Sequence, residues 1–457
     1  MKINNPATGE VVKTVKEDSR KSVKGKFELV KKGQKKWKDV PVTEKIKSIH
    51  RFNELLEKNR ESLAKILTRE VGKPIRQSNN EIKGAQGRIN FFIENSEKWL
   101  SDEWMKKDNG MNEKIAYEPL GVIANISAWN YPYLVGVNVI VPALIAGNGV
   151  LYKPSEFSTL TGLEIGKLLY QAGIPKNAFQ VVVGDKNAGE ALLDLPLDGY
   201  FFTGSNKTGQ YIYERVAKKM VPCQMELGGK DPLYVPDDSK DIKSIAANAA
   251  DGAFYNNGQS CCAVERIYVH QKVYDDFLKA FVEEVKNFKA GNPESEETYI
   301  GAITRKQHVD FLQKQVNDAM KKGAKLLTGG KKKPGKGNFF EPTVLANVNH
   351  KMSVMKDETF GPVIGIQKVK NDEEAVKMME DTYYGLTTAV YCDSHERAEK
   401  ILKQIDSGTV YWNCCDRLSP YLPWSGRKHS GIGVTLSYLG IRAFVKPKAY
   451  HLKGKLG

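Results

Sequence analysis

The chain has 457 residues, more than one hydrophobic core usually serves, so we expect two or more domains. Hydrophobic residues make up 41% and charged residues 27% of it, which is typical of a soluble globular protein. The net charge of +15 comes from lysines and arginines scattered over helix-like stretches, which indicates a solvated surface. Without zinc-finger spacing, an RNA-binding aromatic strand or a basic arm, we expect no nucleic-acid partner.

The cysteines and histidines exclude two further classes of protein. The six cysteines show neither the density of a disulfide scaffold nor a Cys-x-x-Cys pair, which favours a reducing, cytoplasmic compartment. The first residues lack the apolar core of a signal peptide. The seven histidines show no ligand clustering, so we expect no metal site.

The first hundred residues have apolar positions at helical spacing. We expect helices at 42–59, 60–70 and 81–100, with Gly72, Lys73 and Pro74 ending the second of these helical runs. Residues 119–152 carry no charge and are long enough to raise the question of a membrane span. Prolines and glycines interrupt this stretch, so a strand, a buried helix and a second strand explain it better, with no membrane contact.

Strands and helices then alternate. Strands are expected at 121–127, 149–153, 179–184 and 199–203, and helices at 136–146, 158–172, 188–193 and 207–219. This order predicts a doubly wound parallel sheet.

A second α/β block follows from about residue 231. Strand signals lie at 232–235, 266–270, 360–368, 388–391 and 408–413, and helix signals at 242–255, 274–288, 306–322 and 372–380. Residues 329–337 form a glycine- and lysine-rich surface loop.

A thiol and a carboxyl group stand among small residues near the boundary of these two blocks. Cys261 follows Gly258, Gln259 and Ser260, and Glu226 begins the sequence Glu-Leu-Gly-Gly-Lys. A thiolate can attack a carbonyl carbon, and a carboxylate can then activate water, so the pair suggests a covalent catalytic site.

Five more motifs lie in order around this pair, at 128–132, 153–156, 202–205, 358–363 and 423–431. Together the seven motifs resemble the NAD(P)-dependent aldehyde dehydrogenase superfamily, and the resemblance runs from residues 4–9 nearly to the C-terminus. It implies an NAD-binding domain at 1–100 and 120–230 and a catalytic α/β domain at 231–433. Residues 101–119 and 434–457 would form a small β oligomerisation element, so the resemblance implies a homodimer or homotetramer.

The resemblance also implies three catalytic residues. Cys261, two positions after Gln259, would be the nucleophile that forms a thiohemiacetal and then a thioester. Asn130 would stabilise the oxyanion together with the backbone N–H of Cys261. Glu226 would activate the water that releases the carboxylic acid. Relatives that transfer the acyl group to coenzyme A commonly lack this acid, but a coenzyme A-acylating enzyme and a non-catalytic binding member of the fold remain alternatives.

Cofactor contacts follow from the same resemblance. Lys153 and Glu156 would hold the adenosine ribose, and the Glu156 carboxylate would repel a 2′-phosphate, which favours NAD while leaving NADP as an alternative. Glu358 and Phe360 would contact the nicotinamide ribose and ring. Gly204 and Ser205 precede a helix whose N-terminus could face the pyrophosphate, unless the Ser205 side chain caps that helix. The remaining expected cofactor residues are Ile126, Ser127, Trp129, Ser155, Gly184, Gly189, Thr203 and Leu227.

The aldehyde is left open among several classes. Some relatives that oxidise aldehydes with a distal carboxylate, such as succinic semialdehyde, place an arginine where this chain has Asn138. Arg417, in the loop 412–424, could supply that charge instead. Aromatic side chains suit apolar aldehydes and also quaternary ammonium groups such as that of betaine aldehyde. The expected substrate-pocket residues are Tyr131, Tyr133, Asn138, Arg417 and Trp424.

Two local features add further expectations. The closing motif departs from the family at Val434 and Thr435, where relatives often have Arg-Glu, and we expect these positions to be structural. Cys262 adjoins the predicted nucleophile, so oxidation of the Cys261–Cys262 pair could trap the thiol.

Overall fold

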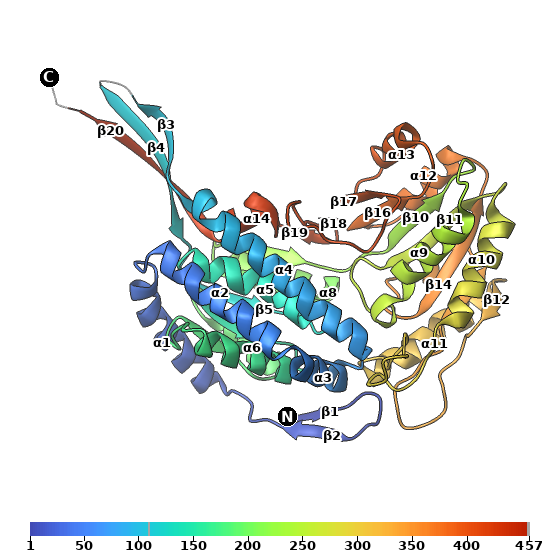
Figure 1. Cartoon of the computed structure of the whole chain (residues 1–457), viewed down its shortest axis with the longest axis horizontal. Helices are drawn as coiled ribbons and strands as arrows, with labels where there is room; N and C mark the ends of the chain where they lie inside the picture. The colour runs from blue at the N-terminus through green and yellow to red at the C-terminus, as the bar shows by residue number, and fades with distance from the viewer. Residues whose placement is uncertain (108–109, 455–457) are drawn as a thin grey trace.

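The N-terminal layer consists of four helices. The computed structural model describes residues 1–107 and 110–454 (Figure 1). The Ser19 side chain caps the first helix by accepting a hydrogen bond of 3.2 Å from the Ser22 amide, and Gly72 ends the third with φ +85°. The expected helices are confirmed, although the last begins earlier, after Pro74. The four helices are α1 (Arg20–Trp37), α2 (Val42–Lys58), α3 (Arg60–Val71) and α4 (Ile75–Leu100).

The predicted doubly wound sheet has six strands in the order β19-β9-β8-β5-β6-β7, and all neighbours are parallel except β19 and β9. The chain runs outward from β5 through β6 to β7, then crosses to β8 and β9, so the order reverses beside β5. The elements are β5 (Val122–Ile126), α5 (Pro132–Ile145), β6 (Gly149–Lys153), α6 (Thr159–Gln171), β7 (Phe179–Val181), α7 (Lys186–Asp194), β8 (Gly199–Thr203), α8 (Asn206–Ala217), β9 (Cys223–Glu226) and β19 (Gly431–Ile432).

Both faces of this sheet are covered, which explains its continuous apolar strands. Val122, Ala124 and Ile126 of β5 pack on α1, α7 and α8, whereas Ile123 packs in the core that α2 to α6 share. The uncharged stretch 119–152 therefore contains β5, α5 and nearly all of β6, as the sequence predicted. No helix among the described residues is long and apolar enough to cross a membrane.

The second sheet has seven strands in the order β12-β13-β14-β11-β10-β16-β17 and is parallel except at its β12 edge. The five expected strands are confirmed, and β12, β13 and α13 were not anticipated. Its elements are β10 (Asp231–Val235), α9 (Ile242–Phe254), η1 (Tyr255–Gly258), β11 (Val264–His270), α10 (Tyr274–Asn287), α11 (Lys306–Lys321), β12 (Lys325–Thr328), β13 (Thr343–Ala346), η2 (Ser353–Met355), β14 (Val363–Val369), α12 (Asp372–Glu380), β16 (Thr387–Val390), α13 (His395–Leu402) and β17 (Thr409–Trp412).

A three-stranded antiparallel sheet of order β20-β4-β3 projects from the body (Figure 1). It combines the expected hairpin, β3 (Glu103–Lys107) and β4 (Met111–Pro119), with the C-terminal β20 (Val445–Lys453). Residues 108–109 and 455–457 of the expected oligomerisation element lie outside the described residues. The smaller elements are β1 (Lys2–Asn4), β2 (Val11–Thr14), β15 (Tyr384–Gly385), β18 (Arg427–Lys428) and α14 (Ser437–Arg442).

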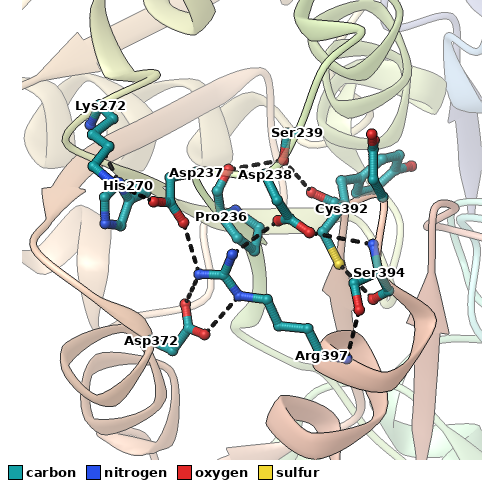
Figure 2. Close-up of polar contacts among 12 residues, drawn as sticks. Pro236, Asp237, Asp238, Ser239, His270, Lys272, Asp372, Cys392, Ser394 and Arg397 are labelled. Atoms are coloured by element: carbon teal, nitrogen blue, oxygen red, sulfur yellow. Dashed lines mark hydrogen bonds and ion pairs between the residues drawn. The ribbon is translucent and has the colours of Figure 1, made fainter.

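Arg397 joins three segments at the carboxyl edge of the seven-stranded sheet (Figure 2). Its guanidinium donates two hydrogen bonds to Asp372 at 2.8 and 2.7 Å and one to Asp238 at 3.0 Å, and it lies 2.9 Å from Asp237. Hydrogen bonds from Lys272 and Arg397 hold the pKa of Asp237 well below its usual range. The cluster therefore ties α13 to α12 and to the loop after β10.

We expect Arg397→Met to lower the free energy of unfolding by about 1–3 kcal/mol, because three carboxylates lose a shared hydrogen-bond donor. Since the folded pKa of Asp237 is depressed, its contribution is present above about pH 4 and is lost as the pH falls through the folded value. The difference in unfolding free energy between wild type and variant should therefore narrow below about pH 4, as measured by urea denaturation from pH 7 to pH 2. Lys403→Met removes only an exposed pair with Glu399 and is the control, expected to leave stability nearly unchanged. Equal effects of the two variants at pH 7 would contradict this role of Arg397.

Candidate active site

The predicted site residues gather where the two large sheets face each other. Ile126, Lys153 and Thr203 end β5, β6 and β8, so they lie at the carboxyl edge of the six-stranded sheet, beside the point where its strand order reverses. Open parallel sheets bind ligands at this point. Glu226 ends β9 beside Thr203 and lies at the same carboxyl edge, whereas Cys261 precedes β11 and Phe360 precedes β14, so these two lie at the opposite, amino edge of the seven-stranded sheet.

The N-terminus of α8 fits the pyrophosphate group that the sequence led us to expect. The Ser205 hydroxyl donates a hydrogen bond of 3.0 Å to Thr208 Oγ1 and does not cap the helix, so the capping alternative is wrong. By contrast, the Asp185 side chain accepts from the Asn187 amide and caps α7. In the part of the chain that the structure describes, no side chain caps the first amides of α8, which suits an anion at a positive helix end.

A lysine and an acid meet after β6. Lys153 is buried, and its Nζ lies 4.0 Å from Glu156 Oε2. Ser155 Oγ donates a 3.3 Å hydrogen bond to the same carboxylate oxygen. This places one positive and one negative side chain where the sequence predicted ribose contacts.

Another expected cofactor residue, Gly189, lies on α7 beside Lys153. A Cβ atom added at Gly189 would be 3.9 Å from Lys153 Cε. Gly184 follows β7 with φ +152°, a conformation that favours glycine. Leu227 is buried and packs on α8 at Gly209, and Ser127 is buried directly after β5.

A buried ion pair shapes the loop that carries Glu358 and Phe360. Glu265 accepts hydrogen bonds of 2.9 Å from the amides of both Thr359 and Phe360, and Lys230 Nζ donates to Glu265 at 2.6 Å. The loop holds Phe360 at φ +48°, which is why β14 starts only at Val363.

Two contacts connect this loop to the rest of the site. The Phe360 ring meets Trp129 edge-on at 5.5 Å between centroids, joining residues from the two sheets. Burial raises the pKa of Glu358 to about 8. A Cβ at Gly228 would lie 2.1 Å from Glu358 Oε1, so the first glycine of the Glu-Leu-Gly-Gly sequence makes room for this carboxyl group.

Cys261 is half-buried and follows a turn with unusual backbone geometry. Asn256 and Asn257 have φ values of +53° and +61°, a conformation that asparagine tolerates better than most residues. Asn257 accepts a 2.6 Å hydrogen bond from the Gly301 amide, which fixes the turn. A Cβ at Gly229 would lie 3.1 Å from the Cys261 carbonyl oxygen, so the chain after Glu226 passes close to the predicted nucleophile.

Asn130 is held through its backbone, which leaves its side chain available. Its carbonyl oxygen accepts hydrogen bonds from Lys73 Nζ at 2.7 Å and from Asn256 Nδ2 at 3.0 Å. Lys73 forms a fully buried ion pair with Glu81, which also accepts a 2.8 Å hydrogen bond from the Tyr133 amide. The Asn130 carboxamide has no hydrogen-bond partner among residues 1–107 and 110–454. Lys73 was expected only to help end a helix, and nothing local in the sequence links it to Asn130.

Glu226 ends β9 and is held by a residue that we expected to be structural. The Thr435 hydroxyl donates a hydrogen bond to Glu226 Oε1, so the departure from the family at this position lies directly at the predicted general base. Burial raises the pKa of Glu226, while the Thr435 hydrogen bond and the positive charge of Arg88 act against this increase. The contact spans more than 200 residues of sequence, which is why the motif alone did not suggest it.

Cys262, the neighbour of the predicted nucleophile, lies in a hydrogen-bonded cluster with Asp416 and Ser260. Its Sγ donates a 2.9 Å hydrogen bond to Asp416, which also accepts one of 3.0 Å from Ser260. The interaction with the Cys261 thiol, burial and the Asp416 carboxylate raise the pKa of Cys262 well above its usual value. The two thiols interact directly, and trapping of Cys261 by oxidation of the Cys261–Cys262 pair stays a prediction.

The five expected substrate-pocket residues are found in different settings. Lys73 Nζ lies 3.9 Å from the centre of the Tyr131 ring, and Trp424 is buried beside the site with its amide bonded to the Thr435 carbonyl. Tyr133 is fully buried in the hydrophobic core, which does not fit a pocket lining. Arg417 is exposed. Asn138 accepts a hydrogen bond from Arg88, a buried arginine that the sequence analysis did not anticipate.

The aldehyde dehydrogenase family profile matches residues 1–450. The chain belongs to the aldehyde dehydrogenase family. It is 33% identical to 3,6-anhydro-alpha-L-galactose dehydrogenase of Vibrio sp. (strain EJY3), over 98% of this chain and 94% of the relative. It is 32% identical to succinate-semialdehyde dehydrogenase [NADP(+)] of Deinococcus radiodurans, over 97% and 93%. A variant of Staphylococcus aureus betaine aldehyde dehydrogenase, solved in complex with NAD+, superposes with a TM-score of 0.94 at 28% identity, covering 99% of this chain and 94% of that one.

Proposed function

We propose that this member of the family oxidises an aldehyde to the carboxylic acid with NAD(P), using Cys261, Asn130 and Glu226. The observation that carries the proposal is the close approach of the three chain segments that bear these residues. Asn256, in the turn before Cys261, binds the Asn130 carbonyl, and the chain leaving Glu226 passes against Cys261. Three segments from two sheets therefore converge on one place.

The three residues act one after another on the same carbonyl group. The Cys261 thiolate attacks the aldehyde carbon, and the unpartnered Asn130 carboxamide donates to the oxygen that becomes negative. NAD(P), when bound, would supply the acceptor for the hydride that leaves the former aldehyde carbon. Glu226 then takes a proton from the water that attacks the Cys261 thioester, and the carboxylic acid is released. Thr435 keeps the Glu226 carboxylate oriented for this step.

NAD is the preferred cofactor in this proposal. The Glu156 carboxylate stands after β6, where the sequence predicts the adenosine ribose, and it would repel a 2′-phosphate. Lys153 is within 4.0 Å of that carboxylate and balances it only in part, which leaves room for weaker use of NADP.

The proposal also includes assembly into a homodimer or homotetramer in the cytoplasm. Two sheet edges carry exposed apolar side chains, Trp104 and Met105 on β3 and Val410 and Trp412 on β17. Exposed edges of this kind can pair with another chain. All six cysteines are free, which agrees with a reducing compartment.

The function is tested by following reduced-cofactor formation with NAD and NADP over neutral, anionic and cationic aldehydes. We expect turnover with NAD to exceed that with NADP and to disappear in Cys261→Ala. Asn130→Ala should lower kcat by about 10²–10³-fold because one oxyanion donor is lost. Cys262→Ser, adjacent to the nucleophile, is the matched control and should retain turnover. Persistence of turnover in Cys261→Ala, or absence of turnover with every aldehyde, would refute the proposal.

Removing the hydroxyl in Thr435→Val should raise the pKa of Glu226, because the hydrogen bond favours its charged form. The base would then stay protonated to higher pH, and the acidic limb of the pH dependence of thioester hydrolysis should move up by about one to two pH units. Thr328→Val, on the edge strand β12, serves as the control. An unmoved limb in Thr435→Val, or equal movement in both variants, would show that Thr435 does not act on Glu226.

A further inference from the structure

Arg88 is a buried cation whose charge the protein leaves unbalanced. It lies on α4, is 8% exposed, and its Nη1 donates a hydrogen bond of 3.0 Å to Asn138 Oδ1 on α5. Within residues 1–107 and 110–454 no carboxylate lies within 4 Å of its guanidinium. A guanidinium has five donors, and this hydrogen bond uses one of them.

A buried guanidinium without a counter-charge lowers the stability of the folded state unless an anion binds beside it. Burying an unpaired charge is strongly unfavourable, and burial lowers the pKa of Arg88, although a guanidinium remains protonated. An arginine fork matches a carboxylate in geometry and can bind both of its oxygens. The structure therefore contains a buried guanidinium that could bind a carboxylate.

The charge of Arg88 lies near the predicted reaction centre, because its partner Asn138 is on α5, the helix that follows Asn130. Among the groups that act on Arg88 are Glu226, Cys262 and Cys261, in decreasing order of effect. The nearby carboxyl groups have other partners, because Glu81 pairs with Lys73 and Glu226 accepts a hydrogen bond from Thr435. The anion that completes the pair must therefore come from outside the chain.

We propose that Arg88, oriented by Asn138, binds the distal carboxylate of the substrate, so that this enzyme prefers semialdehydes of dicarboxylic acids. The inference rests on the proposed function and assigns its substrate class. The hydrogen bond to Asn138 on α5 fixes the position of the Arg88 guanidinium, which reaches α5 from the neighbouring helix α4. The same charge disfavours aldehydes with an amino or trimethylammonium group.

The experiment compares kcat/KM for each semialdehyde with that for the neutral aldehyde of equal carbon number, succinic semialdehyde with butanal and glutaric semialdehyde with pentanal. We expect the wild type to favour the semialdehyde, and Arg88→Gln to reduce the ratio by about 10- to 150-fold, as for a lost charge-assisted hydrogen bond. Asn138→Asp should also reduce the ratio, because its new carboxylate would pair with Arg88. Glutarate, which cannot react, should inhibit the wild type more strongly than either variant.

Arg76→Gln removes an exposed arginine from the same helix and is the control, expected to keep the wild-type ratio. Thermal unfolding of each variant separates loss of fold from loss of recognition. Equal losses of kcat/KM on the charged and neutral aldehydes in folded Arg88→Gln would mean that Arg88 acts on the thiol or on Glu226, and the inference would fail. A wild type that prefers the neutral aldehyde would also overturn it while leaving the proposed function intact, whereas a wild type that oxidises no aldehyde would overturn the proposed function itself.

Discussion

The buried ion pair between Lys73 and Glu81 holds together the parts of the molecule that meet at the reactive carbonyl. Removing one partner of such a pair typically costs about 3–5 kcal/mol, because the other charge is left buried alone. Lys73 also binds the Asn130 carbonyl, and Glu81 binds the first turn of α5. One pair thus fixes both the loop that carries the oxyanion donor and the helix that follows it.

A second buried pair plays the corresponding role on the other sheet. Lys230 and Glu265 hold the amides of Thr359 and Phe360, so the expected nicotinamide contacts are set by the seven-stranded sheet. The site needs both pairs because it lies between the carboxyl edge of one sheet and the amino edge of the other. Neither sheet contains a complete set of catalytic groups.

Much of this arrangement follows from local sequence. The alternation of apolar strands and helices at 121–219 predicts the doubly wound sheet, and the resemblance to the family implies the roles of Cys261, Glu226 and Asn130. The residues that support them were not predicted, because Lys73, Arg88 and Thr435 act across 50 to 209 positions of sequence. The strands β12 and β13 were also missed, because a run of four residues is too short to show a clear hydrophobic period.

The central claim is that Cys261 and Glu226, from different parts of the fold, act one after the other on the same carbonyl carbon. It is tested most directly by intact-mass and peptide analysis of Glu226→Gln mixed with NAD and an aldehyde substrate. The account predicts an adduct equal to the aldehyde less two hydrogen atoms, located on Cys261, that accumulates because its hydrolysis is slow. Formation of reduced cofactor without this adduct, or an adduct on Cys262, would contradict the account.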